Sequence, residues 1–145
     1  MNQSFAALLL AARRERQLVI ATALTDGAPS GQARQARLAQ QQGAGAAELR
    51  ADLLADPAQV RAALTAVRAA SSLPLLLTYR STTEGGKGAG HGQGYEEYLA
   101  SLLQLRPAVD AVDIEMACPA SKALVAEAKA GGYDVVGSCH DFTAT

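Results

Sequence analysis

Short apolar runs alternate along the chain with longer segments in which apolar residues recur at helical spacing. Each run is bounded by turn residues and is short, which is typical of a strand that is buried on both faces. The five runs are residues 17–24, 46–54, 73–80, 111–116 and 133–139. We therefore predict five strands.

The Ala-rich segments between the runs carry helix start and stop signals. Asp56 is a candidate N-cap with Pro57 in the first turn, and Gly43 and Gly45 mark the end of another segment. The segments with helical spacing are residues 31–45, 56–72, 94–107 and 118–132. Strands that alternate with helices predict right-handed crossovers and a parallel sheet, so we predict the α/β class.

Charged residues gather in or just after the downstream halves of the last four runs. They are Glu48, Arg50, Asp52, Arg80, Asp113, Glu115, His140 and Asp141. In parallel α/β folds this end of the strands carries the functional site. An open dinucleotide-binding sheet would have G-x-G-x-x-G after its first strand, and the stretch TDGAPSGQ at 25–32 lacks it. We therefore predict a partial (β/α)8 TIM barrel with parallel strands one to five.

We predict two parts of the chain, an N-terminal helical extension at 1–16 and the incomplete barrel at 17–145. Ser4 is placed to cap an amphipathic helix that follows it. The basic cluster RRER at 13–16 comes after the apolar stretch at 5–12, which is the wrong order for an export signal. We expect neither a leader nor a membrane span.

Composition narrows the choice of partners and of compartment. A formal net charge of −1 gives no basic footprint for nucleic acid. Two cysteines, Cys118 and Cys139, are too few for a disulfide framework, so we predict reduced thiols and a cytoplasmic location.

A glycine-rich stretch, EGGKGAGHGQG, occupies residues 84–94 after the third run. Its alternating glycines resemble a phosphate cradle, but no G-K-[ST] follows them. We favour a mobile active-site loop over a nucleotide site. His91, among those glycines, is predicted to be exposed to solvent rather than to act as a ligand.

Four motifs together resemble one family. They are E-x-R-x-D at 48–52, T-x-R-x-x-x-E-G-G at 78–86, D-x-E at 113–115 and S-x-H-D-F at 138–142. In this order and spacing they resemble the type I 3-dehydroquinate dehydratases, Schiff-base-forming (β/α)8 barrels of the shikimate pathway. The resemblance covers the chain from about residue 17 onward.

The resemblance implies roles for five residues. Glu48, Arg50 and Arg80 match substrate-binding positions. His140 matches the general acid/base, which takes a proton from the carbon next to the imine and later protonates the departing hydroxyl. Glu84 matches the glutamate that hydrogen-bonds this imidazole. The substrate would be 3-dehydroquinate, no cofactor is expected because a lysine imine accepts the electrons, and full-length relatives are expected to be homodimers.

Other polar residues near these motifs have structural interpretations. Asp52 and Asp113 are interpreted as acceptors for hydrogen bonds within the barrel. Glu115 points to the same side as Asp113, and whether it belongs to the network stays open. Ser138 and Cys139 are assigned to strand packing, since no second base or oxyanion-type turn accompanies them.

One residue of the family pattern is missing. The lysine that forms the imine belongs to a sixth strand, and the chain ends at Thr145 before such a unit. Lys87 falls in the glycine stretch, and Lys122 and Lys129 fall on a predicted outer helix, so none is a suitable substitute. We expect the present chain to be an N-terminal fragment with little or no dehydratase activity.

Three alternatives remain open. The chain could be a non-catalytic half-barrel that serves as an assembly or interaction module, or another Schiff-base lyase or aldolase on the same barrel. A metal hydrolase is disfavoured, because the acidic residues and His140 lack the H-x-H and H-E-x-x-H spacings. We therefore predict no metal ligands.

Overall fold

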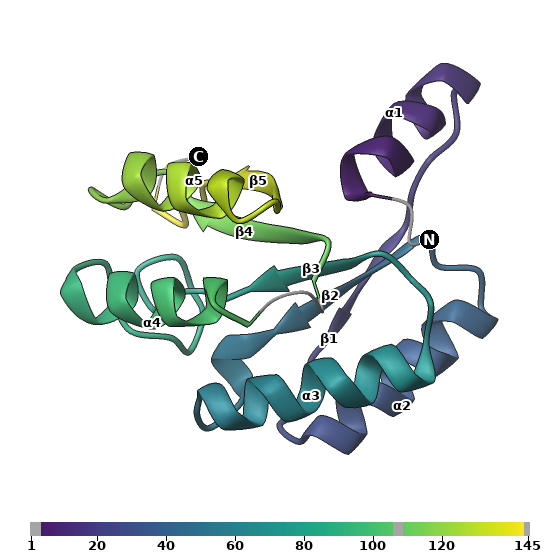
Figure 1. Cartoon of the computed structure of the whole chain (residues 1–145), viewed down its shortest axis with the longest axis horizontal. Helices are drawn as coiled ribbons and strands as arrows, with labels where there is room; N and C mark the ends of the chain where they lie inside the picture. The colour runs from purple at the N-terminus through teal and green to yellow at the C-terminus, as the bar shows by residue number, and fades with distance from the viewer. Residues whose placement is uncertain (1–3, 106–108, 144–145) are drawn as a thin grey trace.

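The computed structural model describes residues 4–105 and 109–143, which form a curved parallel sheet flanked by helices (Figure 1). The strands are β1 (Ala21–Leu24), β2 (Ala46–Arg50), β3 (Leu75–Thr78), β4 (Ala111–Glu115) and β5 (Asp134–Ser138). Their order in the sheet is β1-β2-β3-β4-β5, and every neighbouring pair is parallel. An order that follows the chain is that of a barrel wall, whereas a doubly wound sheet reverses at a switch point. The predicted α/β class and partial barrel are confirmed.

Two of the helices, α1 (Phe5–Glu15) and α3 (Pro57–Ala70), begin at the N-caps that the sequence predicts. The other helices of the described residues are α2 (Pro29–Gln41), α4 (Gln93–Leu103) and α5 (Ser121–Ala130), and a short 3-10 helix, η1 (Ala51–Leu53), follows β2. Ser4 Oγ accepts from the Ala7 amide at 3.1 Å, and Asp56 Oδ1 accepts from the Gln59 amide at 2.8 Å. Both predicted N-caps are therefore formed. None of the helices in the described part of the chain has the length and apolar character needed to cross a membrane.

The outer face of the sheet carries the main hydrophobic core. Side chains alternate between the two faces of a strand, so residues two apart lie on one face. Leu49, Leu75, Leu77, Val112 and Ile114 all point outward and are buried against the helices. The core also takes residues from α2, α3, α4 and α5. This packing holds the strands in place and leaves the inner face for other residues.

The inner face is apolar where the strands begin and polar where they end. At the start, Phe5 of α1 packs against Ala46, Leu76 and Ala111. The Ala6 amide also donates to Asp134 Oδ2 at 2.8 Å, which ties α1 to β5. The helix expected near the N-terminus is therefore present and packs on the sheet. The division into a 1–16 extension and a 17–145 domain stays a prediction.

All five predicted strands are longer in the sequence pattern than in the structure, by four residues in the runs at 17–24, 46–54 and 73–80. The run at 17–24 is a strand only from Ala21, and Leu18 and Ile20 are 97% and 65% exposed. β1 pairs with β2 on one side only, so few ladder bonds extend it. The run at 46–54 leaves the sheet after Arg50 because the backbone turns into η1. Apolar content alone does not reveal either boundary.

Candidate active site

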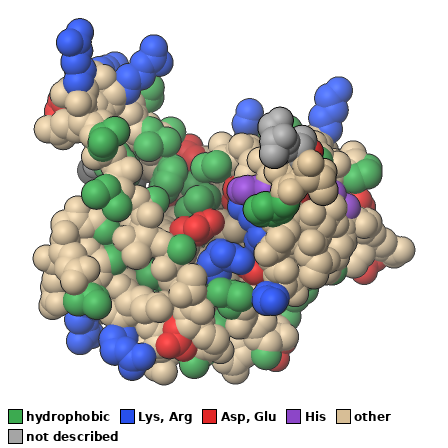
Figure 2. All heavy atoms as spheres, turned by 180° about the vertical axis from the view of Figure 1, so that it is seen from behind, with side chains coloured by type: hydrophobic (Ala, Val, Ile, Leu, Met, Phe, Trp, Pro, Cys, Tyr) green, Lys and Arg blue, Asp and Glu red, His purple; other side chains and the backbone are tan. Residues whose placement is uncertain are grey.

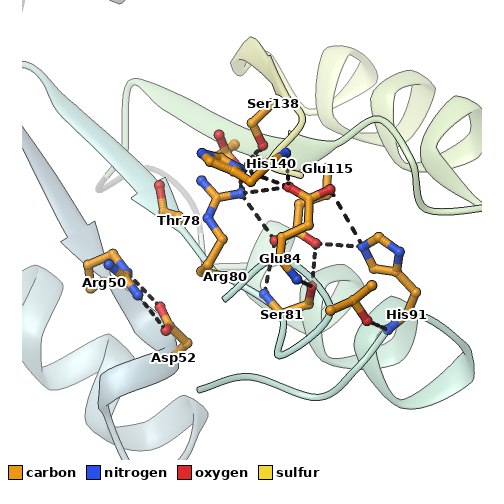
Figure 3. Close-up of polar contacts among 12 residues, drawn as sticks. Arg50, Asp52, Thr78, Arg80, Ser81, Glu84, His91, Glu115, Ser138 and His140 are labelled. Atoms are coloured by element: carbon orange, nitrogen blue, oxygen red, sulfur yellow. Dashed lines mark hydrogen bonds and ion pairs between the residues drawn. The ribbon is translucent and has the colours of Figure 1, made fainter. Parts of the chain in front are cut away.

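Charged side chains and histidine gather at the carboxyl ends of the strands on the inner face, where the surface is hollowed (Figure 2). The alternation of the strands puts Arg80, Glu115 and Ser138 on this face, and the loops that follow β3 and β5 add Glu84, His91 and His140. Figure 3 shows these side chains pointing toward one another. The predicted meeting of polar residues from separate strands is therefore present for β3, β4 and β5.

Arg80 is the centre of this cluster. Its Nη1 lies 3.1 Å from Glu115 Oε1, 3.1 Å from Asp113 Oδ2 and 3.7 Å from Glu84 Oε2. The same nitrogen donates to Ser138 Oγ at 2.9 Å. Burial acts to lower the pKa of the Arg80 guanidinium, but the charges of the neighbouring carboxylates raise it above the ordinary value. Arg80 is thus a fixed cation that links three elements.

Glu84 and His140 form the contact that the motifs imply. Glu84 Oε2 lies 2.8 Å from His140 Nδ1 and accepts from the His140 amide at 3.0 Å. A carboxylate can only accept, so this contact places the imidazole proton on Nδ1 and leaves the lone pair on Nε2. The Glu84 side chain is buried, whereas 41% of the His140 side chain is exposed. The imidazole can therefore reach a bound molecule while a buried carboxylate orients it.

The glycines after Glu84 allow the chain to turn close to β3. Gly85 has φ +83°, which other residues rarely adopt. A Cβ on Gly86 would lie 2.2 Å from the Arg80 carbonyl oxygen. The Gly86 amide donates to Ser81 O at 2.7 Å and the Lys87 amide to Asp52 Oδ2 at 3.0 Å. The E-G-G sequence thus fixes the position of the Glu84 carboxylate, while the mobility predicted for this loop stays a prediction.

Glu115 is a full member of the network. Its Oε1 accepts from Arg80 Nη1 and from the Ser81 amide, and its Oε2 accepts from Ser81 Oγ at 2.6 Å. His91 Nε2 lies 2.6 Å from the same Oε2. Burial acts to raise the pKa of Glu115, but hydrogen bonds from Ser81 and His91 and the charge of Arg80 lower it below the usual value.

The pKa of Asp113 is shifted in the direction opposite to that of Glu115. Its Oδ2 accepts from Ser138 Oγ at 2.8 Å and pairs with Arg80. Burial nevertheless raises the pKa of the Asp113 carboxyl, and the lowering effects of Arg80 and Ser138 do not offset it. Three buried carboxylates, those of Glu84, Asp113 and Glu115, therefore share one guanidinium.

Arg50 of β2 and Asp52 of η1 form a separate pair at the edge of the cluster (Figure 3). Glu48 Oε1 accepts from Thr78 Oγ1 at 2.7 Å. Arg50 donates to both Asp52 oxygens at 2.8 Å through Nε and Nη2. Burial acts to raise the pKa of Asp52, but these bonds and the Lys87 amide lower it below the usual value. The prediction that Asp52 and Asp113 accept internal hydrogen bonds agrees with these contacts.

Two assignments made from the sequence are wrong. His91 is not solvent-exposed, because only 13% of its side chain is accessible and it points at Glu115. The turn at 84–92 folds back over β4, which glycine content alone does not reveal. Ser138 does more than pack, since its hydroxyl bridges Arg80 and Asp113. Ser138 lies two residues before His140, and this spacing could have indicated that its hydroxyl points inward to the same cluster.

The structure adds Ser81 to the residues of the site, and it places the lysines away from it. Ser81 holds Glu115 by both its amide and its hydroxyl and accepts from the Glu84 amide at 3.1 Å. Lys87, Lys122 and Lys129 are all exposed, the first in the glycine loop and the others on α5. No lysine of the chain therefore lies in the described cluster.

A family model described as type I 3-dehydroquinase matches residues 20–145 of this chain. The 3-dehydroquinate dehydratase of Methanosarcina barkeri is 39% identical over 113 residues, which cover 75% of this chain and 47% of that protein. The enzyme of the same name from Methanoregula boonei is 40% identical over 122 residues, covering 83% and 51%. The chain spans about half the length of the curated relatives it matches.

Solved structures agree with the sequence matches. The 3-dehydroquinate dehydratase from Enterococcus faecalis superposes with a TM-score of 0.76 at 28% identity, over 88% of this chain and 55% of that chain. The structure from Geobacillus kaustophilus gives 0.75 at 25% identity, over 88% and 51%. The match along the sequence and the match of the partial barrel cover the same region. This chain belongs to the type I 3-dehydroquinase family.

Proposed function

We propose that this chain supplies the acid/base half of a 3-dehydroquinate dehydratase, which removes water from 3-dehydroquinate to give 3-dehydroshikimate. The observation that carries the proposal is the 2.8 Å contact between the buried Glu84 carboxylate and the half-exposed His140 imidazole. The names of the relatives, all 3-dehydroquinate dehydratases, support the substrate.

His140 would work in two steps at the carbon atoms beside an imine. Its Nε2 takes a proton from the carbon next to the imine carbon, and the electron pair moves into the imine to give an enamine. Nε2 then gives that proton to the hydroxyl one carbon further, which departs as water while a C=C bond forms. Glu84 stabilises the cationic imidazole between these steps and keeps it oriented.

Glu48, Arg50 and Arg80 would bind the substrate on the inner face. Arg50 uses Nε and Nη2 for Asp52, so its Nη1 is left for a substrate oxygen. Glu48 is held by Thr78 on one oxygen and can accept from a ring hydroxyl with the other. Arg80 lies between these residues and His140, where its guanidinium could donate to a substrate oxygen (Figure 3).

The imine requires a lysine that none of the three lysines of this chain supplies. Lys87, Lys122 and Lys129 are all exposed and lie away from the described cluster around His140. We therefore propose that activity needs a lysine from a further barrel segment and that the 145-residue chain alone has little or no activity.

The homodimer and the cytoplasmic location are part of the same proposal. The two free thiols, Cys118 and Cys139, support a reducing compartment.

The proposal is tested by completing the barrel. The chain would be fused to the part of the Methanosarcina barkeri enzyme that follows the matched region, and conversion of 3-dehydroquinate would be followed by product absorbance. Borohydride reduction with substrate should give a covalent adduct. His140→Gln should lower kcat by roughly 100-fold to 10,000-fold without loss of adduct formation.

Lys122→Ala, on the exposed face of α5, is the matched control and should keep full activity. A folded fusion that forms the adduct and keeps its rate after His140→Gln would exclude the assigned role of His140. A folded fusion that forms no adduct would point instead to another reaction on this barrel.

A second candidate is a non-catalytic half-barrel that acts as an assembly module. The observation in its favour is the exposed β1 edge, where Leu18 and Ile20 face solvent. The gene sequence after Thr145 separates the two. A reading frame with an apolar strand that carries a lysine within roughly 30 residues favours the dehydratase, and a stop codon favours the module.

A further inference from the structure

His91 and Glu115 have no role in the proposed dehydration, and both lie beside Glu84, which does have one. Among the described residues, Glu84, His91 and Glu115 each offer one atom that could bind a metal ion, and these atoms lie within 4.8 Å of one another. They come from the glycine loop and from the end of β4 (Figure 3). The two glutamates are buried, and the imidazole is largely buried.

Glu84 has an oxygen that faces this group and lacks a partner. Only 3% of the residue is exposed, and its Oε1 has no hydrogen bond to any described residue. The nearest candidate, His91 Nε2, is 3.9 Å away, which is too far for a hydrogen bond. Leaving a buried carboxylate oxygen unsatisfied is costly, so the site favours an added positive charge at Oε1.

The charges around this oxygen also favour a cation beside it. The buried carboxylates of Glu84, Asp113 and Glu115 face the single guanidinium of Arg80, whose Nη1 lies on the side of Glu84 Oε2 rather than Oε1. Buried charges are stable in proteins when they are paired or bind metal ions. One more cation on the Oε1 side would bring the carboxylates closer to balance.

We propose that Glu84 Oε1, His91 Nε2 and Glu115 Oε2 bind one divalent transition-metal ion of the Zn²⁺ type. An imidazole together with carboxylates is a donor set that suits Zn²⁺ better than Mg²⁺. Ligand bonds of about 2.0–2.1 Å put tetrahedral ligands roughly 3.3 Å apart. At present His91 Nε2 donates to Glu115 Oε2 at 2.6 Å, so Zn²⁺ would replace that proton and move the two atoms apart. Nε2 and Glu84 Oε1, now 3.9 Å apart, would move closer together.

The surroundings of the three ligands are already suited to a metal ion. His140 holds the other oxygen of Glu84, and Arg80 and the Ser81 amide hold the other oxygen of Glu115. The Ser81 hydroxyl donates to Oε2 of Glu115 itself at 2.6 Å and would remain as a hydrogen bond to that ligand. Such outer contacts orient metal ligands. His91 lies between Gly90 and Gly92 in a loop, so its imidazole can move by the small distance required. The spacing of the ligands along the sequence resembles no metal motif, because the turn rather than a helix face brings them together.

The site is tested with Zn²⁺ alone on the 145-residue chain without a histidine tag. Isothermal titration calorimetry should show one Zn²⁺ bound per chain, and Co²⁺ should give the visible bands of a tetrahedral complex. Mg²⁺ in excess should not displace either ion. These readouts do not depend on catalysis, so failure of the dehydratase proposal leaves them unchanged.

The chain has two histidines, which makes a matched pair of variants possible. His91→Gln removes a ligand and should weaken Zn²⁺ binding by about 100-fold or more. His140→Gln removes a contact behind a ligand and should weaken it less than His91→Gln does, by about 10-fold. Cys139→Ser, which removes the exposed thiol, should leave the affinity unchanged.

NMR of the unmodified chain provides a check that needs no variant. Zn²⁺ should shift the ring signals of His91 strongly and those of His140 weakly. The proposal is overturned if Zn²⁺ binds only at millimolar concentration, if Zn²⁺ shifts the His140 ring alone, or if binding depends on Cys139 and survives His91→Gln.

Discussion

At the scale of single residues, two buried aspartates on the same face have opposite electrostatics. The Asp52 carboxylate accepts from Nε and Nη2 of Arg50 and from the Lys87 amide, and its pKa is lowered. Asp113 shares Arg80 with two glutamates, and burial raises its pKa. Asp52 therefore stabilises the fold when it is ionised, whereas ionising Asp113 is costly. Glu115 also shares Arg80, but hydrogen bonds from Ser81 and His91 lower its pKa.

This contrast predicts opposite effects of two amide substitutions. Asp52→Asn should lower the free energy of unfolding by about 1–3 kcal/mol at pH 7, because it removes charged hydrogen bonds. Asp113→Asn should leave it within about 1 kcal/mol or raise it, since an amide oxygen can still accept from Ser138. Urea unfolding followed by circular dichroism measures both values.

The direction of each pKa shift determines how the free energy of unfolding changes with pH. Asp52 has a lowered pKa, so its contribution is present above its unfolded pKa of about 3.9 and is lost as pH falls through the folded value. Asp113 has a raised pKa, so its cost grows as pH rises from about 3.9 through the folded value. Equal destabilisation by both variants at pH 7 would contradict the assignment.

Residue types and spacing predict part of the site. The contact between Glu84 and His140 is expected from the resemblance of the motifs, and in the structure it joins the loop after β3 to the segment after β5. Ser81 and His91 are not foreseen, since their contacts with Glu115 depend on how the loop after β3 turns back. Arg50 is foreseen on the inner face, but its pairing with Asp52 depends on the turn into η1.

At the scale of elements, the glycine loop fixes where the Glu84 carboxylate lies. The amides of Gly86 and Gly88 donate to carbonyl oxygens of Ser81 and Arg80, so the loop folds tightly on the end of β3. Helix caps and apolar runs predict the order of all elements, because propensity and burial agree there. Strand ends differ from the prediction where a local turn or a missing neighbour interrupts the ladder, as at Arg50 and Ala21.

The geometry of the glycine loop predicts that alanine substitutions at two of its glycines differ sharply in their effect on stability. Gly86→Ala would place a Cβ 2.2 Å from the Arg80 carbonyl oxygen and should lower the free energy of unfolding by roughly 1–3 kcal/mol. Gly90→Ala is the matched control, because its Cβ would lie 3.4 Å from the Thr82 and Thr83 hydroxyls. Its effect should stay within about 0.5 kcal/mol. Chemical denaturation measures both, and similar values for the two variants would show that the loop is not held in this turn.

At the scale of the whole molecule, the sheet of the described residues has two edge strands. β1 pairs with β2 alone, and β5 pairs with β4 alone. A groove beside β1 is lined by Ile20, Thr22, Leu38 and Ala44, and apolar side chains around it face solvent. An edge with unpaired amides and carbonyls next to exposed apolar groups is a template for association with another chain.

The exposed β1 edge predicts that the 145-residue chain associates with itself. Sedimentation velocity between about 5 and 200 µM should show a weight-average mass that rises with concentration, since burying an apolar edge gains roughly 25 cal/mol per Å². Leu18→Lys with Ile20→Lys should abolish the rise, because two charges at an edge oppose strand pairing. Ala123→Lys with Ala126→Lys adds the same charge on exposed positions of α5 and should leave the rise intact. If both pairs of substitutions act alike, net charge rather than the β1 edge controls association.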